Sequence, residues 1–186
     1  PGYGYKNIPT PEQAKELAQT LGGKFKILVH RDRDSLTDDE AQILQEYYEN
    51  VGIYLWLTEK SDIEAYFCDI DFLEIFLDCS RDEASRYVLD IIKRHSDPII
   101  EQFNKQRAAH NAELYKEGGS PTNDYVWSEL QSRSLQGAKG KFVFNQLKNN
   151  VPNSSFSTEQ ILATNLNGHI ALDLKHKIEQ IIADDT

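Results

Sequence analysis

Two aspartates that follow an apolar segment are the first residues of the sequence that could hold a metal ion. Asp32 and Asp34 flank Arg33 directly after the run KILVH at residues 26–30. Hard divalent cations such as Mg²⁺ prefer oxygen ligands, and one or two carboxylates commonly hold them together with substrate phosphate. The pair therefore predicts a divalent-metal site. The alternative is a solvated turn whose aspartates cap the helix that follows.

A third carboxylate follows the next apolar segment, IYLWL at residues 53–57. Glu64 lies within the sequence TEKSDIEAYF, which starts directly after that segment. Taken alone, Glu64 is an ordinary acid on a helix face. Ligands gather where the carboxyl ends of neighbouring parallel strands meet, so we expect Glu64 to join Asp32 and Asp34 there. Asp38 is an alternative ligand, or a hydrogen-bond partner of the ligands.

A basic turn with two glycines is the candidate phosphate contact. The sequence GAKGKF at residues 137–142 precedes an apolar helical pattern. A lysine near a helix N-terminus offers one anion both a point charge and backbone N–H groups. Lys141 is the candidate and Lys139 the alternative. No strand precedes the turn, and Phe142 stands where a nucleotide-binding P-loop has Ser or Thr, so the other reading is a solvated helix start.

The elements that position these residues follow from the apolar pattern. Strands at 24–30 and 53–57, separated by a helix over 36–50, predict parallel strands joined by a right-handed crossover. Thr10, Pro11 and Gln13 form a capping box that starts a helix running to about Leu21. We expect an α/β portion over residues 1–78 and an all-helical portion over residues 79–186. A short helix with Ser61 as its N-cap is predicted over the sequence DIEAYF. Further helices are predicted at 69–77, 82–95, 96–116, 123–135, 141–149, 157–165 and 170–183. Loops are predicted at 1–9 and 152–155.

Composition and charge narrow the class of protein. The chain has 186 residues and a net charge of −10, of which residues 1–100 carry −9. Duplex-binding proteins usually present a basic face, but bound Mg²⁺ would offset part of this carboxylate field. No apolar run reaches the roughly 20 residues of a membrane span, and no secretory signal is visible. Cys68 and Cys79 have neither zinc nor disulfide spacing, which favours reduced cysteines in a cytoplasmic protein.

Three chemical schemes compete for the two aspartates of residues 32–34. A calcium EF-hand fails, because its fifth, sixth and twelfth positions would be Leu36, Thr37 and Ile43. A haloacid-dehalogenase-type phosphatase also starts with a strand and two such aspartates, but that family usually has Thr or Val where this chain has Leu36. The third scheme is a topoisomerase–primase (TOPRIM) domain, which binds Mg²⁺ for phosphodiester chemistry.

The order strand, Asp-x-Asp, helix, strand and Ile63-Glu64-x-Tyr66 resembles the TOPRIM nuclease domain of the overcoming-lysogenization-defect (OLD) family. The resemblance covers residues 24–67 and, more loosely, 137–147, where the glycine–lysine helix start is similar. It implies a Rossmann-like parallel sheet and a DNA endonuclease that depends on Mg²⁺ or Mn²⁺. Asp32, Asp34 and Glu64 would then hold two metals, Glu64 would also act in catalysis, and Lys141 would neutralise charge on the scissile phosphate.

The same resemblance implies partners and a biological role. An ATPase domain would precede this segment in one chain, the protein would form homo-oligomers and cleave DNA, and its role would be phage defence. A haloacid-dehalogenase-type phosphatase and a TOPRIM-like interaction module without catalysis remain the alternatives.

One departure from the TOPRIM pattern stands out. Such a domain needs a glutamate at the end of a strand upstream of the two aspartates, whereas only Glu12 and Glu16 precede Lys24, and both lie on a predicted helix. The chain contains no methionine and begins Pro-Gly-Tyr-Gly-Tyr. We therefore expect that it starts inside the domain, and that this fragment alone has an impaired metal site.

Overall fold

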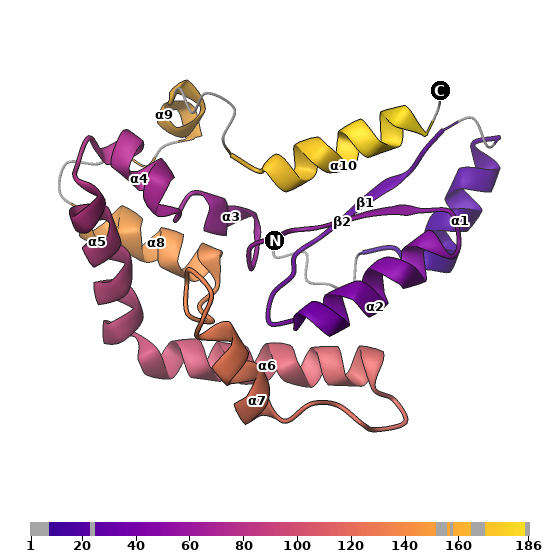
Figure 1. Ribbon diagram of the computed structural model, residues 1–186, viewed down its shortest axis with the longest axis horizontal. Coiled ribbons are helices and arrows are strands. Elements are labelled where there is room, and N and C mark those ends of the chain that lie inside the picture. The colour runs from indigo at the N-terminus through magenta and orange to yellow at the C-terminus, as the bar shows by residue number, and fades with distance from the viewer. Residues whose placement is uncertain (1–7, 23–24, 152–155, 157, 165–169, 185–186) are drawn as a thin grey trace. The chain divides into compact units, whose positions relative to one another are not determined.

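The computed structural model describes residues 8–22, 25–151, 156, 158–164 and 170–184. Within these residues the chain is a mixed α/β protein of ten helices and two strands, shown in Figure 1. Most of the predicted loop at 1–9 and all of the loop at 152–155 lie outside the described residues. None of the described helices combines the length and apolar composition needed to cross a membrane.

The chain folds into two compact units, each built from segments that are distant in the sequence. Unit 1 comprises Pro1–Arg33, Asp38–Glu59 and Ala171–Thr186. Unit 2 comprises Asp34–Thr37 and Lys60–Ile170. Asp32 therefore belongs to unit 1, whereas Asp34 and Glu64 belong to unit 2, and each unit is described by itself.

Unit 1 contains the sheet, which has two parallel strands, β1 (Leu28–Arg31) and β2 (Tyr54–Leu57). Leu28 pairs with Tyr54 and Arg31 with Leu57. The prediction of parallel strands joined by a helix is confirmed. β1 begins four residues later than predicted, because its partner β2 offers pairing only from Tyr54 onward.

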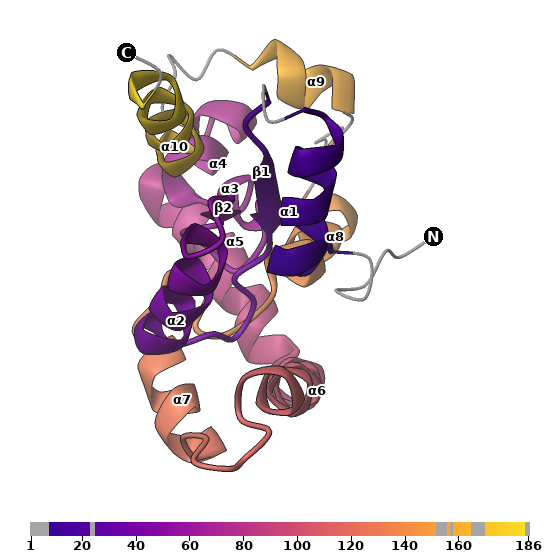
Figure 2. The same ribbon diagram turned by 90° about the vertical axis from the view of Figure 1, so that its right-hand side faces the viewer.

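Three helices belong to unit 1. The helix α1 (Pro11–Thr20) begins with the predicted capping box of Thr10 and Gln13, and α2 (Asp38–Glu49) forms the crossover between the strands. Figure 2 shows α1 on the β1 side of the sheet and α10 (Leu172–Ala183) on the β2 side. Asp173 holds α10 to the end of β2, because its Oδ2 accepts hydrogen bonds from Trp56 Nε1 at 2.8 Å and from the backbone N–H of Glu59 at 3.1 Å.

All the regular secondary structure in the described residues of unit 2 is helical. The predicted helix at 123–135 ends at residue 130, because the chain then turns tightly and reaches positive φ at Gln136 and Gly137. The other helices lie close to their predicted ranges. The helices of unit 2 are α3 (Ile63–Tyr66), α4 (Ile70–Leu77), α5 (Arg81–Arg94), α6 (Ser96–Leu114), α7 (Asn123–Leu130), α8 (Gly140–Asn150) and α9 (Thr158–Ala163).

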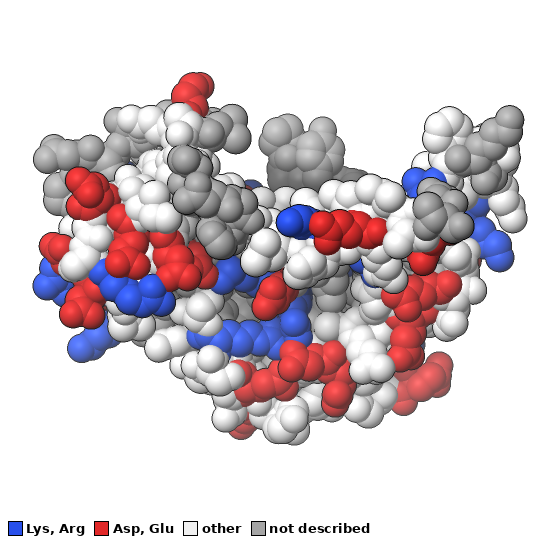
Figure 3. Space-filling model, turned by 45° about the horizontal axis from the view of Figure 1, so that its top comes forward, with Lys and Arg blue, Asp and Glu red and all other residues white. Residues whose placement is uncertain are grey.

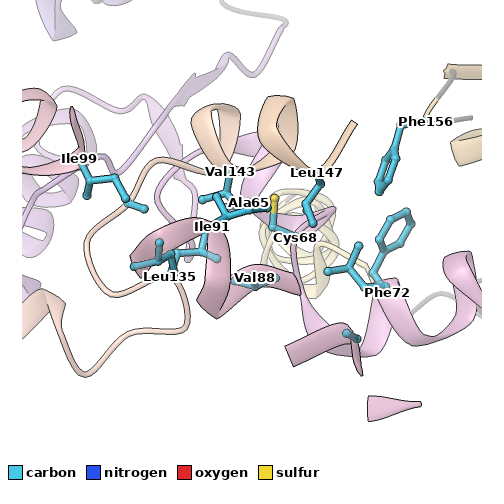
Figure 4. Close-up of a cluster of buried hydrophobic side chains, with 14 residues drawn as sticks. Ala65, Cys68, Phe72, Val88, Ile91, Ile99, Leu135, Val143, Leu147 and Phe156 are labelled. Atoms are coloured by element: carbon cyan, nitrogen blue, oxygen red, sulfur yellow. The ribbon is translucent and has the colours of Figure 1, made fainter. Parts of the chain in front are cut away.

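An apolar core joins the helices of unit 2 that carry the candidate residues. Figure 4 shows Val143 and Leu147 of α8 packed together with Ile91 of α5 and Cys68, which follows α3, and all four are buried. Full burial of a side chain such as Leu or Ile contributes about 1.5–3 kcal/mol. The core therefore fixes α3, α5 and α8 against one another. The Glu64 and Lys141 segments therefore lie on helices that pack against each other within one compact unit.

Candidate metal and phosphate site

The second aspartate of the pair lies in a tight turn of unit 2, called the Asp34 turn here and made of residues 34–37. Asp34 has φ of +50°, the left-handed region that Asp and Asn adopt more readily than most residues. Its backbone N–H donates to the carbonyl oxygen of Ser61 at 2.6 Å. This bond ties the turn to the segment that precedes α3.

The carboxylate of Asp34 is held by two side chains from other parts of unit 2. Lys139 Nζ lies 2.7 Å from Asp34 Oδ1, and Gln106 Nε2 donates to the same oxygen at 2.9 Å. The side chain of Asp34 is 20% exposed and that of Lys139 21%. The structure thus brings together Asp34 and Lys139, which the sequence assigned to two separate motifs.

Gln106 was missed at the sequence level, and no local signal could have found it. It lies on α6, 72 positions from Asp34, on a helix face that shows no motif. The next residue, Arg107, is fully buried and donates from NH1 to the carbonyl oxygen of Ser35 at 3.4 Å. Two consecutive residues of α6 therefore hold two consecutive residues of the Asp34 turn.

A second aspartate of unit 2 joins α3 to α8. Asp62 is 1% exposed, and its Oδ1 accepts from the backbone N–H of Ala65 at 3.0 Å, which caps α3. Its Oδ2 accepts from the backbone N–H of Lys141 at 3.0 Å, and Ser61 Oγ accepts from that of Gly140 at 3.1 Å. These five residues are called the α3–α8 junction. The N-cap of α3 is Asp62 rather than the predicted Ser61, because it is the Asp62 carboxylate that accepts from the backbone N–H of Ala65 in the first turn of the helix.

The glycine of the GAKGKF sequence is required by packing. A Cβ at Gly140 would overlap the backbone N and Cα of Ala65 and Oδ1 of Asp62. Only glycine lets the start of α8 approach α3 this closely. The N–H groups of Gly140 and Lys141, which were expected to face an anion, are already bonded to Ser61 and Asp62. Any anion at this helix start must therefore be met by lysine side chains.

Glu64 and Lys141 lie on either side of this junction. Glu64 is in the first turn of α3 and half-buried, whereas the Lys141 side chain is exposed at the start of α8. Within the described residues neither side chain makes a hydrogen bond or an ion pair. Glu64 is therefore open to a cation and Lys141 to an anion.

Asp32 and its surroundings belong to unit 1. Its side chain is 40% exposed, and Oδ1 lies 3.6 Å from Nε2 of His30. The His30 ring packs on Trp56 with centroids 4.5 Å apart, and burial lowers the pKa of His30. Asp38, the alternative ligand, is exposed at the start of α2 and pairs with Arg33.

Carboxylate oxygens are the kind of ligand that a hard cation prefers, but the described carboxylates are not arranged as a ligand set. Asp34 already holds a cationic group, the Lys139 ammonium, and the Glu64 carboxylate is open. Among the described residues, no group of three or more His, Cys, Asp or Glu side chains is arranged to hold a metal ion. Asp34 and Glu64 lie in unit 2 and Asp32 in unit 1, so their assignment as joint ligands stays a prediction.

The cysteine near this site is not suited to nucleophilic chemistry. Cys68 is 1% exposed in the core, and its Sγ donates to the carbonyl oxygen of Gly140 at 3.5 Å. Burial and the nearby carboxylates of Asp62 and Glu64 raise the pKa of the Cys68 thiol well above its ordinary value. Since the thiolate is the reactive form, Cys68 serves as a core residue.

The surface charge is mixed. On the face drawn in Figure 3, acidic and basic side chains adjoin one another in patches. Comparison with family models, curated proteins and solved structures found no match for this chain.

Proposed function

We propose that this chain carries the TOPRIM-type catalytic residues of a divalent-metal-dependent DNA endonuclease. The observation that supports the proposal is that unit 2 contains three of the expected residues. The Asp34 carboxylate forms an ion pair with Lys139 in this unit, which also contains the half-buried Glu64 carboxylate and the exposed Lys141 side chain. Asp34 and Glu64, with Asp32, would hold Mg²⁺ or Mn²⁺. When bound, such a cation activates water and offsets charge on the reacting phosphate.

The residues of the chain have separate parts in this reaction. Glu64 is placed by the cap of α3 and offers a carboxylate for the metal or for a proton of the attacking water. Lys141 provides a positive charge for the scissile phosphate, with Lys139 as the alternative. DNA, a preceding ATPase domain and a second copy of the chain are the partners of this proposal, with phage defence in the cytoplasm as its setting.

The test uses the protein as the cell encodes it, so that any residues before Pro1 are included. Supercoiled plasmid is incubated with Mn²⁺ or Mg²⁺, and nicking and linearisation are followed. We expect metal-dependent cleavage that falls by about 100-fold or more in Asp34→Asn and Glu64→Gln, since even partners of metal ligands often matter 10–100-fold. Glu117→Gln, an exposed acid of unit 2, should cleave normally.

Small substrates separate this function from a phosphatase. A nuclease of this type turns over a phosphodiester such as bis-p-nitrophenyl phosphate, whereas a haloacid-dehalogenase-type enzyme turns over p-nitrophenyl phosphate. Turnover of the monoester without DNA cleavage would overturn the proposal.

One observation favours a second candidate, an interaction module without catalysis. The Asp34 carboxylate is already neutralised by Lys139 and bonded by Gln106. A full-length protein that binds no Mn²⁺ and cleaves neither DNA nor phosphoesters would have this role.

A further inference from the structure

We propose that α10 pairs with α10 of a second copy of this chain, with the two helices antiparallel around a two-fold axis. The contact surface is called the outer face of α10 here and comprises Leu172, Lys175, Glu179 and Ile182. The proposed function counts a second copy among its partners without naming a surface for it. The pairing of α10 does not depend on nuclease activity.

The side of α10 that faces the sheet of unit 1 is attached by polar bonds. At the start of the helix, Asp173 accepts from Trp56 Nε1 on the β2 side of the sheet, where Figure 2 shows α10. Near its end, the carbonyl oxygen of Ile181 accepts from Lys26 Nζ at 2.7 Å. The structure describes every residue of α10, and none of them is buried. The helix is therefore attached to unit 1 without burying its apolar side chains.

Three large apolar side chains of α10 are exposed. Leu172 is 41% exposed, Ile178 43% and Ile182 61%. An amphipathic helix at the surface of a globular protein usually turns its apolar stripe toward the core. Apolar side chains that share an exposed helix face instead indicate a contact surface for another molecule.

The outer face has the residue spacing of a helix that pairs with another helix. Leu172, Lys175, Glu179 and Ile182 follow one another at intervals of three, four and three residues, which places them on one side of the helix. The face is apolar at both ends and charged in the middle, where Lys175 Nζ lies 3.8 Å from Glu179 Oε1. Both charged side chains are more than half exposed, so a second helix can reach them.

This order of residues is self-complementary when two copies run antiparallel. With the two-fold axis beside residue 177, Leu172 lies opposite Ile182 of the second copy, and Lys175 lies opposite Glu179 of the second copy. The pair then has an apolar contact at each end and two pairs of opposite charge between them. A parallel pair in register would instead set each charge against its own kind, which is unfavourable. Charge complementarity therefore selects a second copy, in the antiparallel orientation, as the occupant of this face.

The residue beside the axis does not obstruct this pairing. Lys177 faces the sheet, where its side chain is only 14% exposed and its Nζ lies 3.6 Å from Glu49 Oε1 of α2. A helix of 12 residues is about 18 Å long, and a contact of that length buries less than the roughly 800 Å² per partner of a standard interface. We therefore expect a weak dimer, with a dissociation constant on the order of 10–100 μM.

The first experiment measures association of the full chain by sedimentation velocity, at concentrations that span this dissociation constant. Lys175→Glu sets carboxylates against each other in the antiparallel pair, and Glu179→Lys sets ammonium groups against each other. Each variant alone should therefore associate at least about tenfold more weakly than the unmodified chain. An equimolar mixture of the two variants should regain association, because every pair across the axis is again of opposite charge. Variants that associate normally, or a mixture that stays as weak as its components, would overturn the inference.

A matched ion pair on another helix provides the control. Glu101 and Lys105 of α6 are also exposed and paired, four positions apart. Glu101→Lys and Lys105→Glu should each associate as the unmodified chain does. If they weaken association as much as the α10 variants, the effect comes from surface charge in general and the inference fails. Melting curves establish that each variant is folded.

Cross-linking reads the orientation of the helices and is independent of any other contact between copies. Leu172→Cys and Ile182→Cys are prepared in chains that also carry Cys79→Ser, because Cys79 is the partly exposed cysteine of the described residues. On mild oxidation the mixture should form a disulfide-linked dimer more efficiently than either variant alone. Equal cross-linking of either variant with itself would contradict the antiparallel pair. A chain that pairs in this way but cleaves no DNA would overturn only the proposed nuclease, so the two failures are distinguishable.

Discussion

The α3–α8 junction and the Asp34 turn each contain an aspartate whose carboxylate accepts hydrogen bonds, but the main donors differ in kind. Asp62 accepts from the backbone N–H groups of Ala65 and Lys141, and also from the Ser61 hydroxyl at 3.4 Å. Asp34 accepts from the side chains of Lys139 and Gln106. Backbone donors within packed helices cannot move away, whereas side-chain donors can. The first carboxylate is therefore fixed in a structural role, and the second is free to exchange partners.

The largest effect is expected from the glycine that makes the junction close. In Gly140→Ala the new methyl group meets the backbone of Ala65 and Oδ1 of Asp62, so α8 must move away from α3. We expect a loss of about 3 kcal/mol or more, the upper end of the cost of overpacking, measured by urea unfolding. Gly119→Ala is the matched control, because this glycine has φ of +86° but open space around it. Its cost should be only the roughly 1–2 kcal/mol of a left-handed residue.

The next effect is expected from the carboxylate of the junction. Asp62→Ala removes the side-chain acceptor of the Ala65 and Lys141 N–H groups, and the loss of an acceptor costs about 1–3 kcal/mol. The Ala65 N–H keeps its bond to the Asp62 carbonyl oxygen at 3.2 Å, so the larger share of the cost falls on the Lys141 N–H. We expect the free energy of unfolding to fall by about 2–4 kcal/mol on this basis. A loss of unfolding free energy smaller than that of Asp34→Asn would contradict the contrast between the two regions.

A smaller effect is expected at the Asp34 turn. Asp34→Asn removes the charge and keeps a residue type that tolerates the left-handed φ of +50°. Lys139 can then turn to solvent, so the free energy of unfolding should fall by only about 1 kcal/mol, as for other partly exposed ion pairs. The same variant should lose much of the Mn²⁺ binding, which Asp62→Asn should retain if it is folded. Calorimetric titration with Mn²⁺ checks both. Equal effects on stability and metal binding at the two aspartates would show that the comparison is wrong.

The smallest effect is a pH dependence in unit 1. Burial lowers the pKa of His30 below the ordinary value of about 6.5, so the unfolded chain takes up a proton at higher pH than the folded chain does. The stability that the neutral ring provides is therefore complete above about pH 6.5 and declines as the pH falls below it. His30→Gln should flatten this part of the curve of unfolding free energy against pH. His176→Gln, on the exposed face of α10, serves as the control.

Local features were predictable from the sequence. The capping box of Thr10 and Gln13 depends on residues three positions apart, and the structure contains it. The parallel pairing of the two strands followed from the helix between them. The N-cap of α3 was misplaced by one residue, because Ser61 and Asp62 are both good capping residues and only the geometry decides between them.

Contacts between distant segments were not predictable. Gln106 and Lys139 meet at Asp34 only because α6 and the start of α8 pack around the Asp34 turn. Similarly, the sequence favoured Lys141 over Lys139, because Lys141 directly follows Gly140 and so matches the glycine–lysine helix start of the family that the chain resembles. The structure separates them by partner, one lysine paired with a carboxylate and the other exposed. The TOPRIM assignment itself rests on the order of motifs and stays a prediction.

The division of unit 1 among three segments has a consequence for the order in which the protein can fold during synthesis. Its strands and first helices precede most of unit 2 in the chain, but α10 follows all of it. Domains generally fold as units while the ribosome extends the chain. The bonds from Trp56 and Glu59 to Asp173 therefore form only after every residue of unit 2 has been made. Until then β2 lacks its covering helix, and the nascent chain exposes an incomplete sheet for the time needed to translate more than half of the molecule.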